Sequence, residues 1–108
     1  MSGKLLQLNF NFSISRAEYE QIATSLATEF AAVDGLRWKI WLMNEGGSEA
    51  GGIYLFDDES SLQAFLAGPL AAQVQSHPAF SDLSAKVFDV LDDPTAVTRG
   101  PVKTGASA

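Results

Sequence analysis

The residues with the clearest chemical potential are three amides at alternate positions near the N-terminus. Gln7, Asn9 and Asn11 alternate with apolar residues in the run from Lys4 to Phe12. An alternation with period two places the amides on one face of a β-strand. Buried amides require hydrogen-bond partners. The row therefore forms either a hydrogen-bonded seam between two subunits or a pocket lining that orients a phenol or carbonyl.

Aromatic residues in two later segments can supply flat walls for such a pocket. These are Trp38 and Trp41 in one segment and Tyr54 and Phe56 in the next. The two tryptophans are three positions apart, so they point to opposite faces of a strand. Alternation along the strand predicts that Trp41 shares the face of the amides and that Trp38 faces the helices. The substrate-binding residues expected from this pattern are Gln7, Asn9, Trp41 and Tyr54.

Two ionisable residues could take part in acid–base chemistry. Lys39 could stabilise a phenolate if it pointed inward, but a solvated lysine is expected. His77, the only histidine, could act as a general base or a haem ligand. It precedes Pro78, which favours extended geometry at the end of a segment, so a surface or packing role is expected. The sequence assigns no catalytic residue.

The acidic and glycine-rich segments have structural interpretations. Residues 57–59 (Asp-Asp-Glu) could bind a metal ion, but they stand where a helix cap belongs, and we expect a cap. The pairs Gly46-Gly47 and Gly51-Gly52 bracket the start of a strand, whereas a phosphate loop leads into a helix. They predict a turn and either a bulge or the close approach of another group. The second pair leaves the direction of Tyr54 open.

The elements that must position these residues follow from the hydrophobic periodicity. Strands are expected at 4–12, 36–44, 49–56 and 84–91, and helices at 15–33 and 59–67, with one or two further helical turns at 70–76. The order β-α-β-β-α-β predicts the ferredoxin-like α+β fold with a four-stranded antiparallel sheet. Two helices cover only one face of that sheet. The other face is too apolar to remain exposed to solvent, which predicts a homodimer with the two sheets facing each other.

Composition limits the class of protein. The chain has 108 residues with a net charge of −6, and its basic residues are scattered, which argues against a nucleic-acid partner. No apolar run is long enough for a membrane span, and no signal peptide is evident. The absence of cysteine favours a cytoplasmic protein. We expect one domain at 1–97 and an extended or disordered tail at 98–108, whose deletion should leave thermal stability nearly unchanged.

Four strings resemble the YdhR family, small bacterial proteins described as mono-oxygenases by similarity to the antibiotic-biosynthesis mono-oxygenases. The strings are Leu5–Phe10, Trp38–Trp41, Glu49–Phe56 and Ala85–Val90, in the family's order. The resemblance implies a dimeric α/β-barrel. It also implies a cofactor-independent mono-oxygenase acting on a small hydroxylated aromatic, in which the deprotonated substrate itself reduces oxygen.

No flavin, haem or metal motif is present in the sequence, so no cofactor is expected. Two alternatives stay open. One is a non-catalytic dimeric binding protein for a small apolar metabolite, and the other is an isomerase or haem degrader of the same fold.

Overall fold

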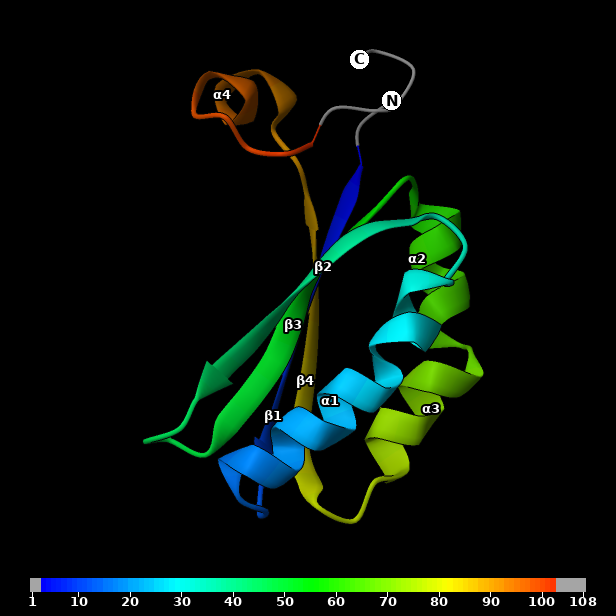
Figure 1. The fold of residues 1–108 in the computed structure, drawn as a ribbon. Coiled ribbons are helices and arrows are strands. Elements are labelled where there is room, and N and C mark those ends of the chain that lie inside the picture. Colours follow the sequence, from blue (N-terminus) through cyan, green and yellow to red (C-terminus); the bar gives the residue numbers. More distant parts are fainter. Residues whose placement is uncertain (1–2, 103–108) are drawn as a thin grey trace.

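The computed structural model describes residues 3–102, which form one antiparallel sheet with helices packed on one face (Figure 1). The strand order is β2-β3-β1-β4, with each neighbouring pair antiparallel. This confirms the ferredoxin-like α+β fold. In chain order the elements are β1 (Lys4–Phe12), α1 (Arg16–Ala31), β2 (Leu36–Asn44), β3 (Glu49–Phe56), α2 (Glu59–Leu66), α3 (Pro69–Ser76), β4 (Phe80–Asp89) and α4 (Asp92–Val97).

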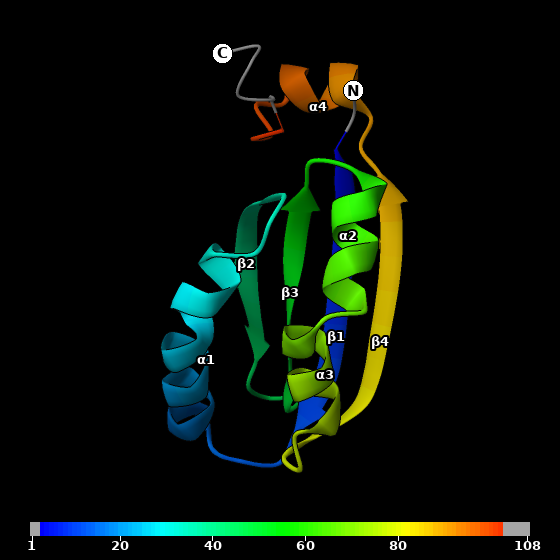
Figure 2. The same cartoon turned by 90° about the vertical axis from the view of Figure 1, so that its right-hand side faces the viewer.

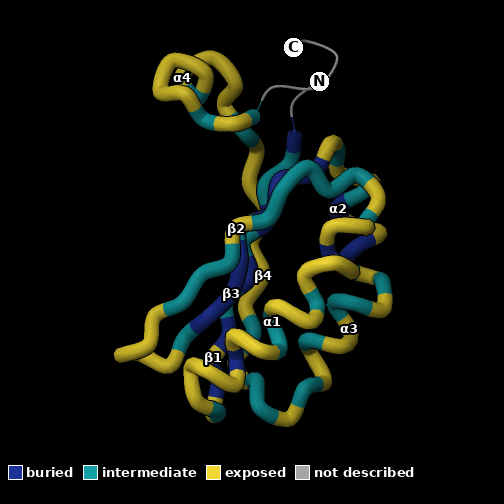
Figure 3. Tube along the Cα trace, viewed as in Figure 1, coloured by how far each residue is buried: buried dark blue, intermediate teal, exposed yellow. Residues whose placement is uncertain are grey.

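The core lies between the sheet and helices α1, α2 and α3, which share one face of the sheet (Figure 2). The even-numbered residues of β1 from Leu6 to Phe12 point into this layer and are buried, as their alternation predicts. Leu62 and Phe65 of α2 close the core from the helix side. Figure 3 shows the central strands β1 and β3 as the most buried part of the backbone. We call the covered side of the sheet the helix face and the other side the open face.

The helix caps form as the sequence predicts. The Ser15 hydroxyl accepts a hydrogen bond from the Glu18 backbone N–H, and the Glu18 carboxylate accepts one from the Ser15 N–H. The Asp58 carboxylate accepts from the Ser61 N–H at 2.8 Å. Asp58 is therefore the cap of α2, Glu59 lies in the first turn of that helix, and Asp57 forms an ion pair with Arg37.

Strand β4 begins earlier and ends earlier than predicted. It runs from Phe80 to Asp89, whereas alternation indicated 84–91. The first part lacks regular alternation because the β1–β4 register shifts between Asn9 and Asn11. Asp82, in this part of β4, has a left-handed φ of 55°. An irregularity of this kind hides a strand from a period-two pattern.

A bulge in β2 reverses the predicted directions of the tryptophans. Leu36 pairs with Phe56, but Trp38 pairs with Leu55, so Arg37 is an extra residue in the strand. One extra residue moves every following side chain to the opposite face. Trp38 consequently lies on the open face, and the prediction that it faces the helices was wrong.

The C-terminal segment contains an element that the sequence analysis missed. Helix α4 stands apart from the other helices, at one end of the sheet (Figure 1). After it, the Pro101 carbonyl accepts a hydrogen bond from Trp38 Nε1 at 2.8 Å, and the Val102 carbonyl accepts one from Arg37 Nη1 at 3.3 Å. The expected tail at 98–108 is described only to Val102, and that part is attached to β2. Residues 103–108 lie outside the described range.

These two bonds change the expected effect of deleting the tail. Removing residues 98–108 takes away both acceptors, at about 0.5–1 kcal/mol each. We expect the melting temperature to fall by roughly 5 °C for a domain of this size, measured by thermal denaturation. A truncation after Val102 keeps both acceptors and serves as the control. If both truncated proteins melt like the full chain, the bonds to β2 add nothing to stability.

Candidate functional site

A groove runs between helix α1 and the edge strand β2 on the helix face. Its volume is about 560 Å³, and its walls include Tyr19 and Ala23 from α1 and Trp41 and Met43 from β2. Arg16 lines the same groove near the start of α1. A volume of this size is within the range of small-molecule sites.

A small cavity lies deeper in the same layer. It measures about 20 Å³, which is enough for one water molecule. Tyr19, Ala23 and Trp41 line both the groove and the cavity, while Lys39 and Tyr54 line the cavity. The Trp41 side chain therefore lies between the open groove and the small cavity.

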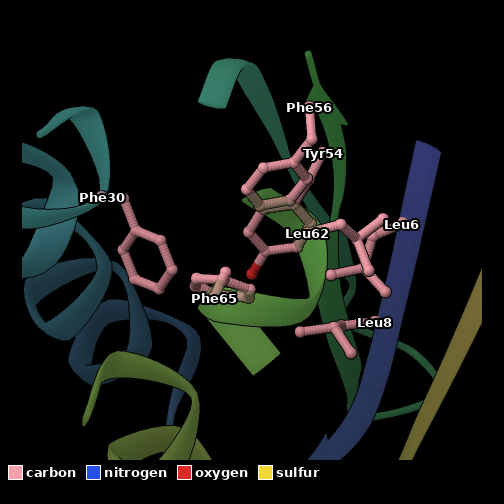
Figure 4. Packing of buried hydrophobic residues seen from close by; sticks show 7 residues of the cluster. All are labelled: Leu6, Leu8, Phe30, Tyr54, Phe56, Leu62 and Phe65. Carbon is pink, nitrogen blue, oxygen red and sulfur yellow. The ribbon is translucent and has the colours of Figure 1, made fainter. Parts of the chain in front are cut away.

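Aromatic rings form most of the inner wall. The Phe30 ring from α1 meets Trp41 edge to face, with centroids 5.3 Å apart, and lies 6.1 Å from Tyr54. Phe65 of α2 lies 5.2 Å from Tyr54. Figure 4 shows Phe30 directed from its helix toward the rings of Tyr54 and Phe65. The inner end of the site is thus a ring-lined, water-poor space.

Lys39 extends into this aromatic space, so the expectation of a solvated lysine was wrong. Its Nζ lies 3.3 Å from the ring centroid of Trp41, 3.6 Å from that of Phe30 and 4.7 Å from that of Tyr54. Within residues 3–102, the Lys39 amine has no hydrogen-bond or ion-pair partner. Burial lowers its pKa to about 7, because the charged form is deprived of water.

Gly52 provides the room for the lysine. A Cβ atom at Gly52 would stand 2.8 Å from Lys39 Cε and 3.2 Å from Tyr54 Cε1. The β1–β3 pairing continues without a register shift through both glycines. Of the two interpretations of Gly51-Gly52, the structure therefore supports the close approach of another group.

The two tyrosines of the cavity are held in the neutral form. Tyr54 is only 3% exposed and Tyr19 is 6% exposed. Burial raises the pKa of each phenol above its ordinary value. Each hydroxyl therefore stays available as a hydrogen-bond donor across the physiological pH range.

The four residues predicted to bind substrate divide between the two faces of the sheet. Trp41 and Tyr54 lie together on the helix face, in the cavity wall. Gln7 and Asn9 lie on the open face, where Gln7 Nε2 donates to Asn9 Oδ1 at 3.0 Å and Asn9 Nδ2 donates to Glu49 Oε2 at 3.1 Å. The prediction that Trp41 shares the face of the amides was wrong, because of the bulge at Arg37.

Sequence reasoning missed two members of the site. Phe30 was not among the residues predicted to bind substrate, and Lys39 was expected in solvent. One signal for Lys39 was present, since it shares a strand face with Trp41, two positions away. The glycine opposite Trp41 was the second signal, because a strand glycine indicates that something crosses over it.

The remaining candidates have local structural roles. His77 Nδ1 accepts a hydrogen bond from the Ala79 N–H at 3.1 Å, and its ring stacks on Phe80 with centroids 4.4 Å apart. This is the packing role that the sequence indicated. Among residues 3–102, no group of three or more His, Asp or Glu side chains is arranged to hold a metal ion.

The fold and the ring-lined site define the class of protein. The chain has the antibiotic-biosynthesis mono-oxygenase type of α+β fold, with a pocket between the sheet and α1. The family described as "Putative mono-oxygenase ydhR" matches residues 5–101, and the chain belongs to this family. The resemblance seen in the sequence is thereby confirmed.

Three solved structures show how widely this fold is used. NE2512 from Nitrosomonas europaea, a protein of unknown function, is 23% identical and has a TM-score of 0.72, covering 84% of this chain and 91% of its own. SnoaB, a cofactor-independent oxygenase from Streptomyces nogalater, is 18% identical (TM-score 0.68; 85% and 96% covered). The heme-degrader MhuD from Mycobacterium tuberculosis is 19% identical (TM-score 0.64; 82% and 97% covered). At these identities the likeness shows the fold alone.

No curated protein sequence matches the chain. Within residues 3–102, none of the helices is both long enough and apolar enough to span a membrane.

Proposed function

We propose that the protein is a cytoplasmic, cofactor-independent mono-oxygenase that acts on a small hydroxylated aromatic at the helix-face site. The observation that carries this proposal is the position of Trp41, whose side chain lines both the open groove and the ring-lined cavity. Membership of a mono-oxygenase family supports the reaction type. The aromatic walls support the substrate class, because flat apolar surfaces bind flat rings.

In this proposal the chain binds the substrate ring, orients its oxygen and excludes water. The ring enters the groove beside α1 and lies against Trp41. Its oxygen is directed inward, where the Tyr54 hydroxyl is a neutral donor. The cavity of about 20 Å³ is too small for a ring, so binding requires side chains to move apart. A water-poor site then strengthens each polar interaction with the substrate.

Oxygen consumption by the metal-free protein tests this function. We expect uptake with a panel of dihydroxy-aromatic compounds, at a rate that depends on protein concentration and is lost in Trp41→Leu. Binding of panel members without oxygen consumption would instead support a non-catalytic binding protein. A Soret band after haem addition, with no oxygen uptake from the panel, would favour a haem degrader.

We also propose that the open face is covered by a second copy of the chain. Ile40 and Phe88 are 51% and 46% exposed on this face, beside the row of amides. Sheet-to-sheet packing would bury them and would place Gln7 and Asn9 in the seam between subunits.

The protein is therefore expected to be a dimer at micromolar concentration, burying about 2,000 Å² in total. Light scattering should give twice the chain mass of 11.5 kDa. Ile40→Glu places a charge on the open face and should yield monomers, whereas Gln63→Glu, at an exposed position of α2, should leave the dimer intact. A monomeric wild-type protein would contradict this assembly.

A further inference from the structure

The inner end of the helix-face site places a single amine among three aromatic rings. Lys39 Nζ lies within 4.7 Å of the centroids of Phe30, Trp41 and Tyr54 and has no acidic partner in the described part of the chain. Lys39 is half-buried, and holding a lysine away from water without a counter-ion is costly, because desolvation disfavours its charged form. Such a group is uncommon unless the site uses it.

We propose that Lys39 is the base that takes the proton from the hydroxyl of a bound phenol, and that it then holds the resulting phenolate as an ion pair. This inference rests on the proposed function. The O–H bond of the phenol breaks, its electron pair stays on the oxygen, and the proton forms an N–H bond on Nζ. The step needs no other reactant.

The geometry suits both the neutral amine and the ammonium form of Lys39. Before the proton transfer the amine is poorly hydrated, and its pKa of about 7 leaves a large neutral fraction near neutral pH. After it, the ammonium remains over the faces of Trp41 and Phe30, which stabilise a cation. The phenolate supplies the counter-ion that residues 3–102 do not provide.

The other groups around the amine do not compete for the proton. The ionisable side chains lining the cavity with Lys39 are Tyr54 from β3 and Tyr19 from α1, and both have raised pKa values. Arg16 and Glu20 line the outer groove at the start of α1 and are paired with each other. The remaining elements contribute apolar residues to the cavity: Phe10 from β1, Val74 from α3 and Phe80 from β4.

Gly52 is a positioning residue in this scheme. Because a Cβ there would meet Lys39 Cε at 2.8 Å, Gly52→Ala should push the amine away from its place over the rings. The variant keeps Lys39 itself. Comparing it with Lys39→Met therefore distinguishes the effect of moving the amine from the effect of removing it.

The probe for this inference is 4-nitrophenol, which absorbs near 400 nm only as the phenolate and is too electron-poor to reduce oxygen. We expect wild-type protein to bind it as the phenolate and to lower its apparent pKa by about one unit or more. In Lys39→Met the bound dye should be neutral at pH 6, and its affinity at pH 8 should fall about tenfold or more. Gly52→Ala should give an intermediate shift, and Gln73→Met, at an exposed position of α3, should match the wild type.

The outcomes separate this inference from the proposed function. A phenolate band that depends on Lys39, without oxygen uptake from any panel member, supports the base and overturns the oxygenase. Equal spectra for wild type and Lys39→Met overturn the base, even if oxygen is consumed. Failure of 4-nitrophenol to bind at millimolar concentration also overturns it, because the groove is then not a phenol site.

Discussion

Replacing Lys39 with methionine is expected to raise the free energy of unfolding by about 1–3 kcal/mol at pH 6. At this pH the amine is charged in both the folded and the unfolded chain, and folding must move the charge into an apolar space. A pKa lowered from 10.5 to about 7 corresponds to roughly 1.4 kcal/mol per unit, and cation–π contacts with the neighbouring rings offset part of it. Methionine fills a similar volume without the charge.

The stability that Lys39→Met gains over the wild type should shrink as the pH rises. Between pH 7 and pH 10.5 the folded chain has released this proton and the unfolded chain still holds it. The unfolded state then binds more protons, so the wild type becomes more stable with rising pH relative to the variant. Urea denaturation at pH 6 and pH 10 measures the difference. Gln73→Met, at an exposed position of α3, should show no such trend. A loss of stability in Lys39→Met that is equal at both pH values would contradict the burial of a charge.

Trp41→Leu and Asn9→Ala are expected to have different consequences, because the two residues lie on opposite faces of the sheet. Loss of the Trp41 ring should weaken the binding of a small phenol about 5- to 30-fold, equivalent to about 1–2 kcal/mol. Asn9→Ala should change this affinity by less than about twofold. It removes the donor to Glu49 and the acceptor for Gln7, so it should weaken the dimer instead.

Isothermal titration and light scattering on the same samples check both halves of this prediction. Trp41→Phe is the control, because it keeps a ring beside Phe30 and should retain most of the affinity. If Asn9→Ala weakens binding as strongly as Trp41→Leu, the ligand contacts the open face. The assignment of the binding site to the helix face would then be wrong.

The fold could be predicted from the sequence because its signals are local and regular. The strand from Lys4 to Phe12 alternates without interruption, and Ser15 and Asp58 mark helix starts by their capping chemistry. The order of these elements was sufficient for the topology. Short α4 lacked such signals, with no side-chain hydrogen bond at its N-cap.

The site was predicted only in part because one bulge decides which residues meet. Trp41 and Tyr54 were chosen for their rings, and they do lie together. Gln7 and Asn9 were joined to them by counting alternation through Arg37, where the strand gains a residue. A bulge depends on the pairing with another strand, here β3, so no pattern within β2 alone reveals it. The direction of Lys39 follows from the same shift.

The most direct test of the helix-face site uses the two tryptophans as reporters, since the chain contains only two. Incorporation of 5-fluorotryptophan gives two ¹⁹F resonances, which Trp38→Phe and Trp41→Phe assign. On titration with a small phenol, the Trp41 resonance should shift with saturation, and the Trp38 resonance, from the open face beside Pro101, should stay in place. A saturable shift of Trp38 with no change at Trp41 would contradict the account, because the ligand would then occupy the opposite face of the sheet.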